Sequence, residues 1–177
     1  MNLNKCLNFL HAHGASGIEH SGEDFLSHLK GTMDLLKNWG APEHLYLAGL
    51  FHSVYGTEVF QDSLIPDGLR PQVKELIGEE AEEIAYLFGI MDRKSFLKLL
   101  SQQKDFYICS RFDKEKIAIP KELFQKLCNL YIANRLEQHP RWPNEWKYAE
   151  KEEMNLIRAF IYERAILALN KEYHFQK

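Results

Sequence analysis

The sequence predicts an all-α protein, a helical bundle with at most one small β-hairpin near residues 106–119. Apolar residues recur at spacings of three and four along most of the chain, as on one face of an α-helix. Glycine and proline stand at the ends of these runs, where helices commonly stop and start. At 177 residues, a single domain spanning 1–177 is expected, long enough to bury a full apolar core.

Three helices are expected in the first third of the chain. The first covers about Leu3–Ala12 and ends before Gly14. The second is expected to begin at Ser21, because Asp24 three residues later resembles a capping box. Its predicted buried face comprises Phe25, His28, Leu29, Thr32, Leu36 and Trp39. Pro42 suits the first turn of the third helix, whose predicted shared face comprises Leu45, Ala48, Gly49 and His52.

The middle and end of the chain alternate between loop and helix. Residues 56–69 contain two glycines and a proline, so we expect a loop. The acidic run at residues 79–83 is interpreted as a solvated helix start that favours the helix dipole. A partly alternating pattern predicts the hairpin near 106–119. The remaining predicted helices are about Pro71–Ile77, Glu79–Gly89, Arg93–Gln103, Lys121–Gln138 and Tyr148–Tyr173.

Composition limits the classes of partner. Hydrophobic residues make up 45% and charged residues 27%, which is typical of globular proteins, and the net charge of −3 argues against nucleic acid or an anionic membrane as partner. Three cysteines without C-x-x-C spacing suggest reduced thiols in a cytoplasmic protein. We find no leader sequence and no run of about 18 apolar residues, so we expect no membrane partner; the oligomeric state is left open.

Three polar residues lie on apolar helical faces, where such side chains need a partner or a function. They are His28, His52 and Asn134, the last preceded at helical spacings by Leu127, Leu130 and Tyr131. Imidazole is the commonest side-chain ligand for first-row metals, so convergence of the three would suit a metal ion. The alternative is that each is a hydrogen-bonded core residue.

Two segments resemble the HD superfamily of helical metallohydrolases. Ala48-Gly49-Leu50-Phe51-His52-Ser53 is similar to the Ala-Ala-Leu-Leu-His-Asp segment of guanosine-tetraphosphate hydrolase domains, and Ala133-Asn134-Arg135-Leu136 to their Ala-Asp-Arg-Leu. The chain also resembles a small HD-like family of unassigned function. The resemblance implies an HD-like bundle and a divalent manganese, iron or zinc ion held by His28, His52 and Asn134, with His20 as a further nitrogen ligand.

The chain departs from the HD pattern at positions that bind the metal and activate water in that family. Ser53 and Asn134 stand where the family has aspartates, and the water-activating acids of the tetraphosphate hydrolases fall at Gly56-Thr57. Glu58 is the nearest carboxylate and therefore the candidate catalytic base. The chain has no histidine between His52 and His139, so a second metal would lack ligands and one metal is expected.

A small-molecule ligand is expected, with Tyr55, Arg93 and Gln138 as candidate substrate-binding residues. The sequence shows no glycine-rich phosphate loop and no dinucleotide fingerprint, so no organic cofactor is expected. One hypothesis is a mononuclear metal-dependent hydrolase of a small phosphorylated or nucleotide-like substrate. The alternative is a non-catalytic HD-like module that has lost the metal and binds a ligand or partner.

Overall fold

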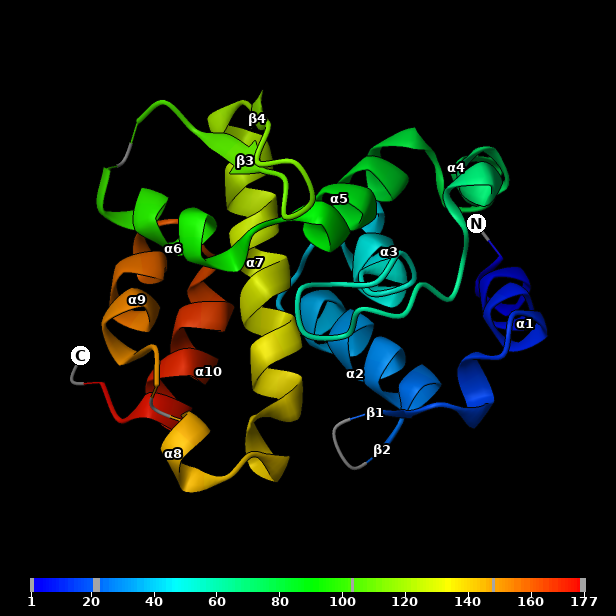
Figure 1. Ribbon diagram of the computed structural model, residues 1–177. Helices are drawn as coiled ribbons and strands as arrows, with labels where there is room; N and C mark the ends of the chain where they lie inside the picture. Colours follow the sequence, from blue (N-terminus) through cyan, green and yellow to red (C-terminus); the bar gives the residue numbers. More distant parts are fainter. Residues whose placement is uncertain (1, 21–22, 103, 148, 176–177) are drawn as a thin grey trace.

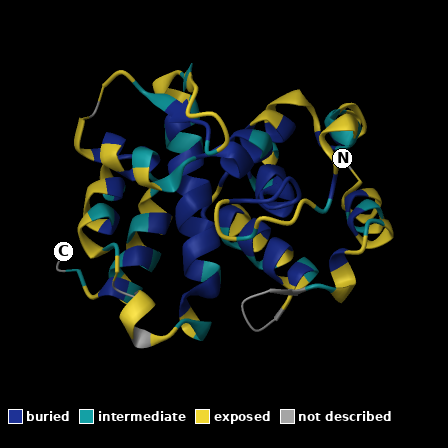
Figure 2. Ribbon diagram, in the orientation of Figure 1, coloured by how far each residue is buried: buried dark blue, intermediate teal, exposed yellow. Residues whose placement is uncertain are grey.

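A computed structural model describes residues 2–20, 23–102, 104–147 and 149–175, and only the backbone of 19, 20, 23, 144 and 147. It confirms a mostly α-helical fold with a small β-hairpin where one was predicted. Helix α7 (Lys121–Gln138) runs through the middle of the molecule, with α1–α5 on one side and α6 and α8–α10 on the other (Figure 1). Most of α7 is buried (Figure 2), so it is the shared core element of the two groups of helices.

The first group starts as the sequence predicts, apart from one helix boundary. Its elements are α1 (Leu3–Ala12), the 3-10 turn η1 (Ala15–Gly17), strands β1 (Glu19–His20) and β2 (Glu23–Asp24), α2 (Phe25–Asn38) and α3 (Glu43–Phe51). Helix α2 begins at Phe25 rather than at Ser21, which lies outside the described residues. Asp24 caps this helix by accepting hydrogen bonds from the backbone N–H groups of Leu26 and Ser27, at 3.0 and 3.1 Å.

Helices α2 and α3 pack closely through the faces that the sequence predicts. Gly49 permits this approach, since a Cβ atom there would lie 2.7 Å from Leu36 Cδ1 and 3.4 Å from the Met33 Cα atom. His28 on α2 and His52 at the end of α3 are both fully buried. The close packing of the two helices therefore brings two imidazoles into one apolar interior.

The middle of the chain follows the prediction within a few residues. After the loop come η2 (Asp67–Leu69), α4 (Arg70–Ile77), α5 (Glu79–Ile90), α6 (Arg93–Gln102), β3 (Tyr107–Cys109) and β4 (Lys116–Ala118). The interpretation of the acidic run as wholly solvated is wrong at Glu82, whose side chain is fully buried. Glu82 accepts hydrogen bonds from Arg70 Nε at 2.6 Å and Nη2 at 3.1 Å, and from the Tyr55 hydroxyl at 3.1 Å. A buried carboxylate needs such partners.

The predicted helix Tyr148–Tyr173 is not continuous. The structure has η3 (His139–Arg141), α8 (Asn144–Lys147), α9 (Lys151–Leu156), η4 (Ile157–Ala159) and α10 (Glu163–Tyr173), while Tyr148 itself lies outside the described residues. At the break before α10, Asn129 of α7 accepts a hydrogen bond from the Tyr162 N–H at 2.9 Å and donates to the Phe160 carbonyl at 3.5 Å. A side chain from another helix thus replaces hydrogen bonds that a continuous helix would make.

Among the described residues, no helix combines the length and apolar character that crossing a bilayer requires.

Candidate metal centre

The structure brings together the three side chains that the sequence selected as metal ligands. His28 comes from α2, His52 follows the last turn of α3, and Asn134 comes from α7. His28 Nε2 lies 3.1 Å from His52 Nε2, and His52 Nε2 lies 2.9 Å from Asn134 Oδ1. The side chains of all three residues are buried, so the cluster lies inside the bundle where α2, α3 and α7 meet.

The hydrogen bonds made by the two Nδ1 atoms indicate the tautomer of each histidine. His28 Nδ1 donates to a carboxylate oxygen of Glu137, and His52 Nδ1 donates to the Gly49 carbonyl at 2.7 Å. Because both of these oxygens are acceptors, each neutral imidazole carries its proton on Nδ1 and its lone pair on Nε2. With these tautomers, the two Nε2 atoms and Asn134 Oδ1 are three electron-pair donors close to one another, an arrangement that a metal ion or a shared proton would bridge.

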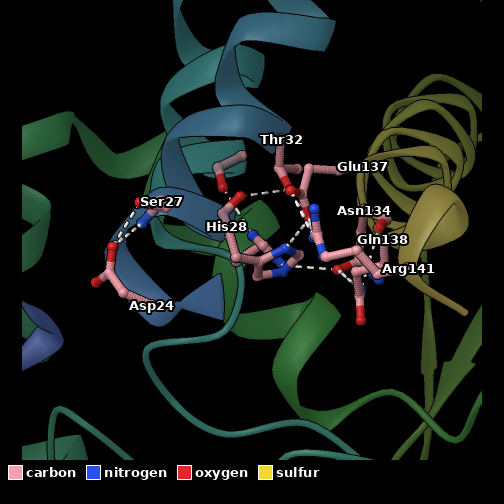
Figure 3. Close-up of polar contacts among 10 residues, drawn as sticks. Asp24, Ser27, His28, Thr32, Asn134, Glu137, Gln138 and Arg141 are labelled. Atoms are coloured by element: carbon pink, nitrogen blue, oxygen red, sulfur yellow. Dashed lines mark hydrogen bonds and ion pairs between the residues drawn. The ribbon is translucent and has the colours of Figure 1, made fainter. Parts of the chain in front are cut away.

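Glu137 is the functional residue that the sequence pattern did not select. Figure 3 shows it on α7 beside His28, with Arg141 on its other side. Arg141 Nη2 donates to both Glu137 oxygens, at 2.7 and 2.8 Å. Burial alone would raise the pKa of Glu137, but the hydrogen bonds and charges of His28 and Arg141 outweigh burial and lower that pKa. A carboxylate behind a histidine is the usual outer partner of a metal-bound imidazole.

The geometry of the donor set fits a single divalent ion. Two imidazole nitrogens at about 2.1 Å from one ion lie about 3.0 Å apart at a right angle and about 3.4 Å apart at the tetrahedral angle. The 3.1 Å between the two Nε2 atoms falls within this range. The described residues hold no cluster of three or more histidine, cysteine or acidic side chains placed for a metal ion, and the third donor here is an amide oxygen. Gln138 Nε2 donates to Asn134 Oδ1 at 3.0 Å, which orients that oxygen toward His52.

A cavity of about 130 Å³ adjoins this cluster. Its lining comprises Ser53, Thr57, Val59, Arg93, Asn134, Gln138, Trp142 and Trp146. Among these described lining residues, Arg93 alone carries a formal charge, and its guanidinium lies 6.0 Å from the centre of the Tyr131 ring. Two of the three predicted substrate-binding residues, Arg93 and Gln138, therefore line a cavity that Asn134 connects to the histidines.

Arg135, which the sequence marks only as part of the Ala-Asn-Arg-Leu segment, holds the tryptophan side of the cavity. The Arg135 side chain is 8% exposed, and its guanidinium lies 4.7 Å from the Trp142 ring centre. It donates to the Trp146 carbonyl at 3.3 Å and to the Glu150 carboxylate at 2.8 Å. A guanidinium can serve several acceptors at once because it has five N–H groups in a rigid plane.

The other predicted site residues lie elsewhere. The Tyr55 hydroxyl donates to buried Glu82 and not to the histidine cluster, and burial together with the Glu82 charge raises its pKa. The Glu58 carboxylate is exposed and accepts a hydrogen bond from the backbone N–H of Arg93, the first residue of α6, at 2.9 Å. Glu58 instead borders a neighbouring hollow of about 530 Å³ that also includes Arg93. The His20 backbone lies in β1, and its side chain is outside the described part of the chain.

A family model described as "Domain of unknown function (DUF6817)" matches residues 9–93, which is less than half of the chain. The matched region includes His28 and His52 and ends before Asn134. No curated protein and no solved structure matches the sequence.

Proposed function

We propose that this protein is an HD-like, mononuclear metal-dependent hydrolase of a small phosphorylated or nucleotide-like substrate. The observation that carries the proposal is the convergence of His28 Nε2, His52 Nε2 and Asn134 Oδ1 beside a cavity that contains Arg93. Manganese, iron or zinc suits two imidazoles and an amide oxygen, with His20 proposed as an additional ligand. The buried free thiols Cys6, Cys109 and Cys128 agree with a cytoplasmic location.

The residues of the chain have distinct tasks in this proposal. His28 and His52 hold the ion, while Glu137 and the Gly49 carbonyl keep their Nε2 lone pairs directed at it. A bound divalent ion polarises a phosphate ester and acidifies water. Arg93 binds the anionic group in the cavity, and Gln138 orients the amide of Asn134. Together these contacts position the ester close to the ion.

A specific observation favours the second candidate, a non-catalytic module that binds a ligand in the same cavity. No carboxylate occurs among the described residues that line the cavity. Glu58, the candidate base, instead accepts the hydrogen bond from Arg93 at the start of α6. A ligand-binding module needs the cavity and Arg93, but it needs neither a base nor a metal.

Metal content tests the proposal directly. Untagged protein purified without chelator is expected to hold up to one transition metal per chain, with manganese, iron or zinc added back after dialysis.

Ser53→Asp with Asn134→Asp should strengthen metal binding, because two negative charges are added beside the cation. Each carboxylate should also destabilise the metal-free protein. Elemental analysis measures metal binding, and thermal melts with and without metal measure stability. If added metal stabilises the double variant no more than it stabilises wild type, the result argues against the proposed site.

Glu58→Gln separates enzyme from binding module. If Glu58 is the general base, turnover of a phosphate ester should fall by about 10²–10⁴-fold, with ligand affinity largely kept. The Arg93 N–H keeps an acceptor in the glutamine variant, so the hydrogen bond at the start of α6 is retained. Turnover that is unchanged removes Glu58 from the mechanism. A wild type that turns over none of a panel of nucleotides and phosphate esters supports the binding module.

A further inference from the structure

We infer that the ligand of the small cavity is an aromatic phosphate ester, whose phosphate enters the cavity while its ring packs on Trp146 and Val59 at the rim. This inference rests on the proposed function for the assignment of the cavity as the substrate site. The new element is the chemical class of the substituent on the phosphate, an aromatic ring that remains outside the cavity. Its support comes from the size of the cavity, the polarity of its lining and the exposure of its rim.

The size of the cavity limits what can enter. The cavity measures about 130 Å³. Whole small-molecule ligands usually occupy pockets of about 300–1,000 Å³. A tetrahedral oxyanion therefore fits the cavity, whereas the remainder of a larger ester must lie outside it.

The polar part of the lining suits such an oxyanion. Ser53 and Thr57 contribute hydroxyl groups and Arg93 the positive charge. The Gln138 amide N–H groups already donate to Asn134 and do not serve as donors to the anion. Charge-assisted hydrogen bonds from a guanidinium to phosphate are among the stronger polar contacts in proteins. The cavity is thus complementary to a small anion in both charge and volume.

The rim of the cavity is apolar and exposed. Val59 is 74% exposed and Trp146 is 60% exposed, and both line the cavity together with half-buried Trp142. Large apolar side chains gathered at the mouth of a cavity commonly mark a binding surface. An indole face next to an anion site is suited to a planar aromatic group attached to the phosphate.

The tryptophan wall is preformed. Arg135 is itself held by Glu150 and Tyr173, and it contacts both the Trp142 ring and the Trp146 carbonyl. A wall fixed before the ligand arrives loses less conformational freedom on binding. Arg135 thus holds the Trp142 ring and the backbone of Trp146 in place before a ligand arrives.

Calorimetric titration with three probes tests the inference: inorganic phosphate, methyl phosphate and phenyl phosphate, each against protein with and without added manganese. Wild type should bind phenyl phosphate roughly five- to hundred-fold more tightly than methyl phosphate, the range expected of ring stacking on an aromatic side chain. Trp146→Ala should remove most of this preference, weakening phenyl phosphate binding much more than inorganic phosphate binding, and Trp146→Phe should restore much of it. Leu167→Ala is the matched control, since Leu167 is an apolar residue on α10 that is 57% exposed.

The outcomes separate this inference from the proposed function. Equal affinity for phenyl and methyl phosphate in wild type overturns the inference, as does a preference that survives in Trp146→Ala. Failure of all three probes to bind the manganese-loaded protein overturns it too. A preference that depends on Trp146 in protein that binds no metal supports the inference and counts against the hydrolase.

Discussion

A His52→Ala variant is expected to bind no metal, while wild type binds up to one ion per chain. His52 Nε2 is the central donor, since it lies 3.1 Å from His28 Nε2 and 2.9 Å from Asn134 Oδ1. Its loss leaves one imidazole and one neutral amide oxygen, too few ligands for stable binding of a transition metal. Elemental analysis after manganese, iron or zinc is added back gives the stoichiometry, and turnover should be lost with the metal.

His44→Ala is the matched control for this experiment. His44 lies on α3, the helix that ends just before His52, but its Nδ1 atom faces the Glu80 carboxylate at 3.3 Å and its side chain is 29% exposed. The control should keep the metal content of wild type. Thermal melts of both variants show whether each remains folded. Metal retained at wild-type stoichiometry in a folded His52→Ala protein contradicts the proposed site, and a ratio near two contradicts a mononuclear one.

Arg70→Met is expected to destabilise the protein by about 3 kcal/mol, because it leaves the Glu82 carboxylate buried without its main partner. Glu82 is fully buried and takes two hydrogen bonds from the Arg70 guanidinium. Lys74 Nζ lies 3.9 Å from Glu82 Oε2, within ion-pair range but longer than a hydrogen bond. The guanidinium also covers the Tyr86 ring, 3.3 Å from its centre, and this contact is lost as well. Urea unfolding at neutral pH measures the change in free energy.

The double variant Arg70→Met with Glu82→Met identifies the cause. If the penalty comes from the unpaired carboxylate, removal of both charged groups should recover most of the lost stability. The recovery should be incomplete, since the Tyr55 hydroxyl loses its acceptor at Glu82. A single Arg70→Met variant within about 0.5 kcal/mol of wild type, the range typical of surface substitutions, contradicts the assigned role of the pair.

The sequence predicted most of the helices and the apolar faces that carry the histidines. Spacings of three and four fix which residues share a helical face, and this depends only on local geometry. The faces that carry His28, His52 and Asn134 are buried as predicted. The long final helix was the main error, because Asn129 of α7, rather than any local signal, supplies the hydrogen bonds at the break.

The partners of each site residue were decided by tertiary structure. Glu137 lies 109 residues from His28, so no local spacing relates them. The contacts of Arg135 with the tryptophan segment and of Glu58 with the start of α6 likewise depend on how the helices pack. Helical periodicity determines which side chains face the interior, but not which of them meet there. The sequence by itself therefore determined the fold class and the candidate ligands, whereas only the packing of α2 and α3 against α7 decided the donor geometry, the outer carboxylate and the shape of the cavity.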